Sequence, residues 1–232
     1  MSIVGNWKGR MAIARQSKGD VAGAMKLYEE AMAAGMDSAR YMLAYSVLLL
    51  REGQYEKTKS VLVKTQKAPG LSEAQRQQLF MNYAVACHKL GDTKRAVEMM
   101  EKQHLRNPSG LVYNTLGYLY VEAGDLEKAE EFNLKALEYD DSDAISLDNM
   151  GQTLYRLKGD KAAAKPYFDK AIKEKPGQID TLYFLAQYDI EAGKKEEALE
   201  KLEKALEGRF SPLNYAGKEQ IETLIQQLKG AE

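Results

Sequence analysis

Few residues of this chain have side chains suited to nucleophilic attack, proton transfer at neutral pH or metal binding. They are the single cysteine, Cys87, and the two histidines, His88 and His104. Neighbouring residues on a helix do not face each other, so we expect Cys87 to pack inward and His88 to lie on the surface of a groove. The sequence has no HExxH or CxxC spacing and no glycine-rich phosphate loop. We therefore expect no enzymatic activity, no metal site and no cofactor.

The elements that would carry any site are most regular between residues 111 and 141. This stretch predicts two amphipathic helices, at about residues 111–122 and 126–139, in which apolar and small residues recur every three or four positions. These residues are Tyr113, Leu116, Gly117 and Tyr120 in the first helix and Ala129, Phe132, Ala136 and Leu137 in the second. Gly124 is expected to end the first helix in the left-handed conformation, and Asp125 is expected to cap the second.

Versions of this helix pair recur along most of the chain. The glycines expected to end the first helices are spaced by 34, 38, 33, 35 and 34 residues, and they are Gly19, Gly53, Gly91, Gly124, Gly159 and Gly193. A period of about 34 residues with a helix-turn-helix in every unit is the tetratricopeptide pattern. On the segments LGYLYVEAGDLEKAEEFNLKA, MGQTLYRLKGDKAAAKPYFDKA and LAQYDIEAGKKEEALEKLEKA, the chain resembles the tetratricopeptide repeat (TPR) family.

The resemblance implies an all-α fold: a right-handed α-solenoid of helix-turn-helix repeats that forms a single domain over residues 1–232. About six repeats are expected, near residues 5–35, 37–70, 72–108, 110–142, 143–176 and 178–210. A capping helix is expected at residues 217–229, where one apolar face would cover the last repeat. That face consists of Ile221, Leu224, Ile225 and Leu228.

Three departures from the regular repeat are expected to have local effects. Ser72 followed by Gln75 predicts a capping box, so the four extra residues of the third repeat should lengthen its first helix to about residues 72–90. The fifth repeat carries one extra residue before Gly159. Pro166 lies about one turn into a second helix, where a small distortion is expected.

Charge is unevenly distributed along the chain. Residues 1–110 contain 17 Lys and Arg and 10 Asp and Glu, a net charge of +7, whereas residues 111–232 contain 16 and 24, a net charge of −8. Solvated helix faces explain such a pattern. A basic end that binds an acidic partner or an anionic membrane surface would also explain it. So would oppositely charged ends that attract each other head to tail. Because the basic residues are spread around the helices and the pI is near 6.2, no nucleic acid partner is expected.

Cysteine usage and hydropathy bear on location. One cysteine cannot form an internal disulfide, which fits a reducing compartment, and no apolar run reaches the length of a membrane span. The expected location is therefore the cytoplasm. Because the repeats begin almost at once, and many bacterial TPR proteins carry a membrane anchor before them, the alternative is the cytoplasmic face of a membrane, with an upstream anchor removed.

Stacked helix pairs curve, and the first helices line the concave side. The resemblance therefore predicts a peptide-binding groove there. Spacing assigns to this groove Arg40, Leu43, Val47, Met81, Val85 and His88, which are mostly apolar, and Asn114, Tyr118, Asp148, Gln152, Tyr155, Tyr183 and Gln187, which mix aromatics with amides. Both sets suit a peptide. The alternative, that the side chain packs on a neighbouring helix, is expected for half of Leu43, Val47, Met81 and Val85. Asn82 and Asn149 are expected to serve the fold.

The predicted function is a non-enzymatic protein–protein interaction scaffold that binds a peptide or a segment of a partner protein. The alternative is self-assembly into a dimer or short stack, since the first repeat has no cap, Trp7 lies near the edge and the two ends differ in charge. The chaperone carboxylate clamp of the family is not expected. The matching positions are Gly9, Leu43 and Met81, where a clamp would require lysine at least once, so a ligand with a C-terminal EEVD-type sequence is not predicted.

Overall fold

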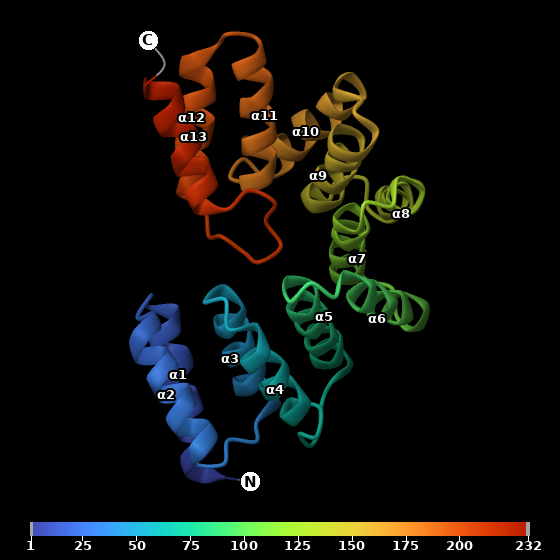
Figure 1. Cartoon of the computed structure of the whole chain (residues 1–232). Helices are drawn as coiled ribbons and strands as arrows, with labels where there is room; N and C mark the ends of the chain where they lie inside the picture. Colours follow the sequence, from blue (N-terminus) through green and yellow to red (C-terminus); the bar gives the residue numbers. More distant parts are fainter. Residues whose placement is uncertain (1, 231–232) are drawn as a thin grey trace. The chain divides into compact units, whose positions relative to one another are not determined.

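A computed structural model of the chain describes residues 2–230, and every regular element within that range is a helix (Figure 1). Helix pairs follow one another in chain order, so the fold is an all-α helical repeat of the solenoid class. The helices divide into two compact units, which meet in the sequence between Asn107 and Pro108. The single continuous right-handed solenoid expected from the sequence stays a prediction.

The N-terminal unit contains α1 (Ile3–Ser17), α2 (Val21–Ala33), α3 (Ala39–Arg51), α4 (Tyr55–Thr65), α5 (Glu73–Lys89) and α6 (Thr93–Arg106). The C-terminal unit contains α7 (Gly110–Ala123), α8 (Leu126–Tyr139), α9 (Ala144–Gln152), the π-helical segment η1 (Thr153–Lys158), α10 (Lys161–Glu174), α11 (Ile179–Glu191), α12 (Lys195–Leu206) and α13 (Lys218–Gly230).

The turn inside each repeat has the predicted glycine in a left-handed conformation. The backbone φ angle lies between 69° and 88° at Gly19, Gly53, Gly91, Gly124, Gly159 and Gly193. Side chains other than glycine rarely adopt this region, because their Cβ meets the backbone. In four repeats the next residue is an aspartate that accepts a hydrogen bond from a backbone N–H in the first turn of the second helix. The cap predicted at Asp125 is confirmed, with 3.2 Å between its Oδ1 and the Lys128 nitrogen.

The departures from the period have clear structural counterparts. Ser72 and Gln75 form the predicted capping box, and α5 is 17 residues long, longer than the other first helices. The extra residue before Gly159 is accommodated by π-helical turns in η1, which have more residues per turn than an α-helix. Pro166 lies inside α10, which continues through it, so no break occurs there.

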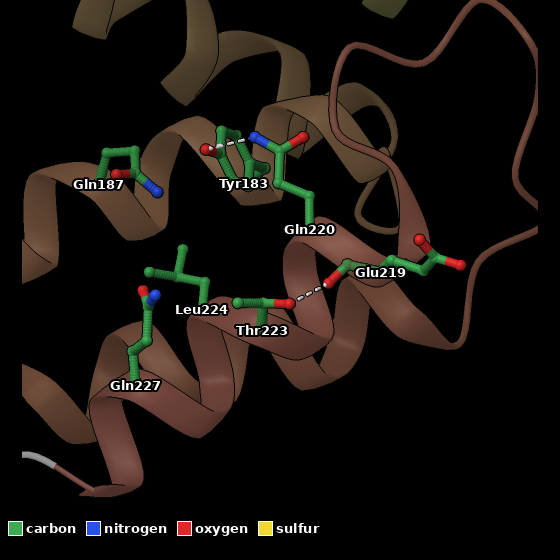
Figure 2. A pocket seen from close by; sticks show the side chains of 7 residues that line it. All are labelled: Tyr183, Gln187, Glu219, Gln220, Thr223, Leu224 and Gln227. Atoms are coloured by element: carbon green, nitrogen blue, oxygen red, sulfur yellow. Dashed lines mark hydrogen bonds between the residues drawn. The ribbon is translucent and has the colours of Figure 1, made fainter.

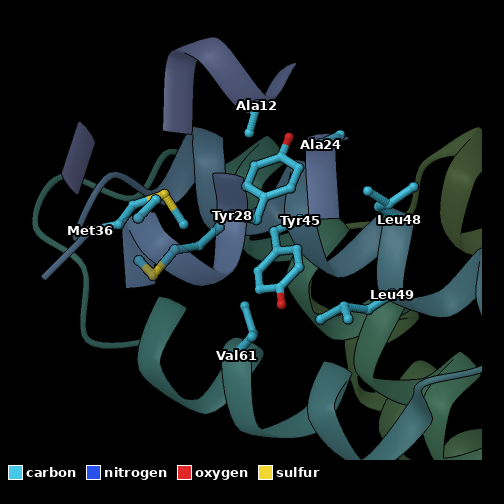
Figure 3. Close-up of a cluster of buried hydrophobic side chains, with 10 residues drawn as sticks. Ala12, Ala24, Tyr28, Met36, Tyr45, Leu48, Leu49 and Val61 are labelled. Carbon is cyan, nitrogen blue, oxygen red and sulfur yellow. The ribbon is translucent and has the colours of Figure 1, made fainter. Parts of the chain in front are cut away.

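The core of the N-terminal unit holds α1 against α3 (Figure 3). Tyr28 of α2 and Tyr45 of α3 stack with their ring centroids 4.7 Å apart, and both side chains are buried. Ala12 packs on the same cluster from α1. Because aromatic stacking adds to the free energy of area burial, this cluster gives α1 and α3 a fixed relation to each other.

Buried asparagines join consecutive first helices in both units. Asn82 Nδ2 of α5 donates to Ser46 Oγ of α3 over 2.8 Å, and Asn149 Nδ2 of α9 donates to the backbone oxygen of Asn114 in α7 over 3.0 Å. Both asparagines are nearly inaccessible to solvent. Their expected role in the fold is therefore confirmed.

The predicted capping helix forms as α13. Its buried residues Ile221 and Ile225 pack in one cluster with Leu182 of α11 and Leu202 of α12. Leu224 and Leu228 lie against the same cluster. The apolar face expected from the sequence therefore covers the last helix pair.

Candidate functional site

All thirteen residues predicted to line the groove lie on first helices. Arg40, Leu43 and Val47 lie on α3; Met81, Val85 and His88 on α5; Asn114 and Tyr118 on α7; Asp148 and Gln152 on α9; Tyr155 on η1; and Tyr183 and Gln187 on α11. Their accessibility differs widely. Arg40 is exposed, seven are half-buried, and the buried ones are Leu43, Val85, Tyr118, Asp148 and Gln152. The buried five contact other parts of the chain, so the accessible part of the predicted surface is smaller than the sequence suggests.

Asp148 and Asp180 form the most unusual cluster on this face, because both carboxylates are buried. Asp148 accepts hydrogen bonds from Thr181 Oγ1 (2.5 Å) and Gln152 Nε2 (2.7 Å). Burial raises the pKa of Asp148 to about 7, and the charge of Asp180 contributes to the rise. Burial also raises the pKa of Asp180. Asp148 therefore joins α9 to α11 and is not available to a partner.

Asp180 fixes the segment between α12 and α13. Its carboxylate accepts a hydrogen bond from Asn214 Nδ2 (3.0 Å) and another from the backbone nitrogen of Ala216 (3.1 Å). Between these two residues, Tyr215 stacks on Phe184 with ring centroids 5.2 Å apart. An irregular segment of the chain itself therefore lies on this part of α11.

Arg156 of η1 also contacts the segment between α12 and α13. Its Nη1 donates to Glu122 Oε1 (2.7 Å) and Gln152 Oε1 (2.9 Å), and its guanidinium lies 4.0 Å from the ring centroid of Tyr215. The first-helix face from α7 to α11 is thus used for internal contacts. Tyr215 lies on an irregular segment, about which helical spacing gives no information. Arg156 lies on a helical segment four residues after Gln152, so its spacing was a usable signal.

An open groove lies beyond this region, between α11 and α13 (Figure 2). Its volume is about 370 Å³, and it is lined by Tyr183, Gln187, Glu219, Gln220, Thr223, Leu224 and Gln227. Two of the predicted site residues, Tyr183 and Gln187, meet here. The other five come from α13, which the sequence analysis treated only as a cap. Their spacing was a usable signal, because positions 220, 223, 224 and 227 share one side of a helix.

The groove has hydrogen-bonding groups with spare capacity. Gln220 Nε2 donates to the Tyr183 hydroxyl over 3.0 Å, which fixes the tyrosine at the wall (Figure 2). Gln187 Nε2 is buried and has no hydrogen-bond partner among the described residues. Its amide points toward the α13 side chains in Figure 2. A buried amide N–H without an acceptor costs about 1–3 kcal/mol, so a rotation of the Gln187 side chain that brings this N–H to an acceptor in the groove would be favoured.

The groove is suited to an extended polypeptide. Glutamine amides donate and accept hydrogen bonds as a peptide backbone requires. The Tyr183 ring and Leu224 supply apolar area, and Glu219 is the charged residue of the lining. The groove therefore combines the amides and the aromatic surface that the sequence analysis expected of a peptide site.

The residues considered for chemistry do not assemble into a site. Cys87 is buried, and burial raises the pKa of its thiol, which disfavours the reactive thiolate. His88 is half-buried, and its Nδ1 lies 3.0 Å from Thr93 Oγ1. Within residues 2–230, no three His, Cys, Asp or Glu side chains are grouped as a metal site would require. None of the helices described in that range has both the length and the apolar character needed to span a bilayer.

Two family models match the sequence. The model described as "Tetratricopeptide repeat" matches residues 77–108, 111–143 and 145–178, and the one described as "Tetratrico peptide repeat" matches residues 9–67. Together these ranges cover more than half of the chain. They include most of α1 and α5, and α2 to α4 and α6 to α10 almost entirely.

A curated relative is similar over part of its length. Cellulose synthase operon protein C of Pseudomonas fluorescens (strain SBW25) is 29% identical over a 173-residue alignment, which covers 71% of this chain and 13% of that protein. The chain therefore spans only a small part of this relative.

Several solved structures share the fold. A thermophilic TPR protein of Thermus thermophilus has a TM-score of 0.66 at 19% identity, over 83% of this chain and 99% of that one. PilW, described as a widely conserved type IV pilus biogenesis factor, has a TM-score of 0.66 at 16% identity, over 97% and 100%. MamA has a TM-score of 0.57 at 19% identity, over 76% and 94%.

Proposed function

Since this chain belongs to the tetratricopeptide repeat family, we propose that it is a non-enzymatic scaffold that holds an extended segment of a partner protein in the groove between α11 and α13. The observation that carries the proposal is the unsatisfied Gln187 amide in that groove. Once the Gln187 side chain rotates toward the groove, a backbone carbonyl of a bound segment would accept its N–H. This removes the cost of the unpaired donor and fixes the register of the segment.

The shape and charge of the groove favour a polypeptide segment over a small charged ligand. The lining contains one charged residue, Glu219, and three glutamines on two neighbouring helices. Helices α11 and α13 are held together by Ile221 and Ile225 on the core side, so the groove is built on rigid elements. A segment that lies along it would gain apolar contact from Tyr183 and Leu224 and hydrogen bonds from the amides.

The proposal is tested with peptides from a phage-displayed random library, selected for binding to the full chain. The selected peptides are then measured against Gln187→Leu, which removes the donor and keeps the bulk, and against Gln227→Ala in the wall of the groove. We expect each variant to weaken binding by about tenfold, which corresponds to the loss of one well-made hydrogen bond.

Gln226→Ala is the matched control, because Gln226 is an exposed glutamine of α13 that does not line the groove. Its affinity for the selected peptides should equal that of the wild type. The proposal fails if the library yields no binder, if both groove variants bind as well as the wild type, or if the control loses affinity equally. Circular dichroism confirms that each variant is folded.

Self-association is a second candidate, and one observation favours it. The apolar residues Ile3, Val4 and Trp7 of α1 are 85%, 58% and 59% exposed, and a second copy could cover them. Sedimentation velocity on the wild type and Trp7→Ser tests this candidate. A concentration-dependent dimer that the substitution dissolves supports it, and a monomer at all concentrations rules it out.

A further inference from the structure

The N-terminal unit contains a second concave site with different chemistry. A pocket of about 320 Å³ lies between α1 and α3 and is lined by Arg10, Ile13, Arg40 and Tyr41. Both arginines are exposed, and neither forms a hydrogen bond or an ion pair with the described residues. Two guanidinium groups therefore face one pocket without a counter-charge.

This arrangement depends on a close approach of the two helices. A Cβ at Gly9 would lie 3.0 Å from the Cβ of Tyr41 and would overlap Met36, so only glycine permits this packing. Arg10 follows Gly9 on α1, and Arg40 precedes Tyr41 on α3. The same contact that packs the helices therefore brings the two arginines to one pocket.

Some other cations of the unit have acidic partners. Lys8 pairs with Glu30, Arg15 with Asp20, and Lys57 with Glu29, at distances of 2.7, 2.8 and 2.5 Å. Residues 1–110 nevertheless have a net charge of +7. Arg10 and Arg40 are thus part of the excess positive charge, at a place where the surface is hollow.

We propose that the Arg10–Arg40 pocket binds glutamate or aspartate side chains of an acidic partner segment. A guanidinium pairs with a carboxylate through two parallel hydrogen bonds, and it is more weakly hydrated than an ammonium group. Ile13 and the Tyr41 ring provide an apolar floor for the methylene groups of a glutamate. The pocket is too small for a folded domain and is recessed between two helices, so an extended chain fits it better than a flat membrane surface does. This site is separate from the α11–α13 groove.

The test uses an end-blocked peptide of alternating glutamate and glycine, its glutamine counterpart and inorganic phosphate. Trp7 is the only tryptophan of the chain and lies one helical turn before Arg10, so its fluorescence reports binding. Thermophoresis of the labelled peptide gives a second readout. The wild type should bind the glutamate peptide at least about tenfold more tightly than the glutamine peptide, as a charge-assisted contact predicts, and added salt should weaken this binding.

The double variant Arg10→Gln/Arg40→Gln should lose at least about tenfold in affinity for the glutamate peptide. The control Arg76→Gln/Arg106→Gln removes the same charge from exposed arginines outside the pocket and should stay within about twofold, the effect of general charge alone. The proposal is overturned if neither readout detects the peptide, if glutamate and glutamine peptides bind equally, or if the control loses as much. It is also overturned if phosphate displaces the peptide at equal concentration, or if the arginines prove to hold a second copy of the chain in a dimer.

Discussion

Replacement of Asp148 by asparagine is predicted to stabilise the chain at neutral pH. Asp148 is buried on α9, and its two oxygens accept from Thr181 and Gln152. Asparagine can keep both contacts, because its Nδ2 can donate to Thr181 Oγ1 while its Oδ1 accepts from Gln152. The substitution thus removes a buried charge and leaves the hydrogen bonds in place.

The pH dependence follows from the direction of the pKa change. Burial, together with the charge of Asp180, raises the folded pKa of Asp148 from 3.8 to about 7. The folded chain therefore holds this proton more tightly than the unfolded chain does. The stability gained in this way is complete below about pH 4 and is lost as the pH rises through about 7. At about 1.36 kcal/mol per pKa unit, the free energy of unfolding that is lost between these two pH values is at most about 4 kcal/mol.

Urea unfolding of the wild type and Asp148→Asn at about pH 4 and pH 7.5 measures this effect. We expect the variant to be more stable by up to about 4 kcal/mol at the higher pH and by less than about 1 kcal/mol at the lower pH. Asp141→Asn is the control, because the Asp141 side chain is 85% exposed and its loss should change stability by less than about 0.5 kcal/mol. Equal stability of variant and wild type at neutral pH, or a gain that is larger in acid, would show that Asp148 does not carry a destabilising buried charge.

Three further substitutions test the packing of the C-terminal unit by urea unfolding. Gly117→Ala should destabilise by about 1–3 kcal/mol, because the added Cβ would overlap Asn133 Oδ1, whereas Gly177→Ala, with open space around it, should not. Ile221→Ala should cost about 2–5 kcal/mol, because Ile221 is fully buried on the side of α13 that packs on α11 and α12; a smaller loss would mean that α13 does not act as a cap. Pro166→Ala should stabilise by about 1–3 kcal/mol through a restored backbone hydrogen bond in α10, and an unchanged unfolding midpoint would contradict this.

The repeat fold could be predicted because its signals are local. Glycines with positive φ end the first helices, and aspartates directly after several of them cap the second. The capping box at Ser72 likewise set the start of the longest first helix. The π-helical turns of η1 could not be assigned, because one extra residue before Gly159 could equally have lengthened the turn. Whether the extra residue lies in a π-helical turn or in a longer loop depends on packing against neighbouring helices.

The site was harder to predict than the fold. Spacing placed Asp148 and Gln152 on the first-helix face, but it could not show that Thr181 and Arg156 would engage them there. Those contacts come from residues on other turns and helices. Because of them, Asp148 and Gln152 are buried, although their spacing is typical of surface residues. The polar side of α13 was visible in the spacing of Gln220, Thr223 and Gln227. It was passed over because the apolar side explained the helix as a cap.

A titration of a selected peptide into the chain labelled at leucine methyl groups, followed by NMR, locates the bound peptide directly. Leu224 lies in the α11–α13 groove. Leu134 is the control, because it lies on α8, outside the groove, and is 43% exposed. If the peptide lies in this groove, the Leu224 methyl signals will shift and will show nuclear Overhauser effects to the peptide, with Leu134 unchanged. Shifts at Leu134 or at other leucines, with Leu224 unaffected, would contradict it.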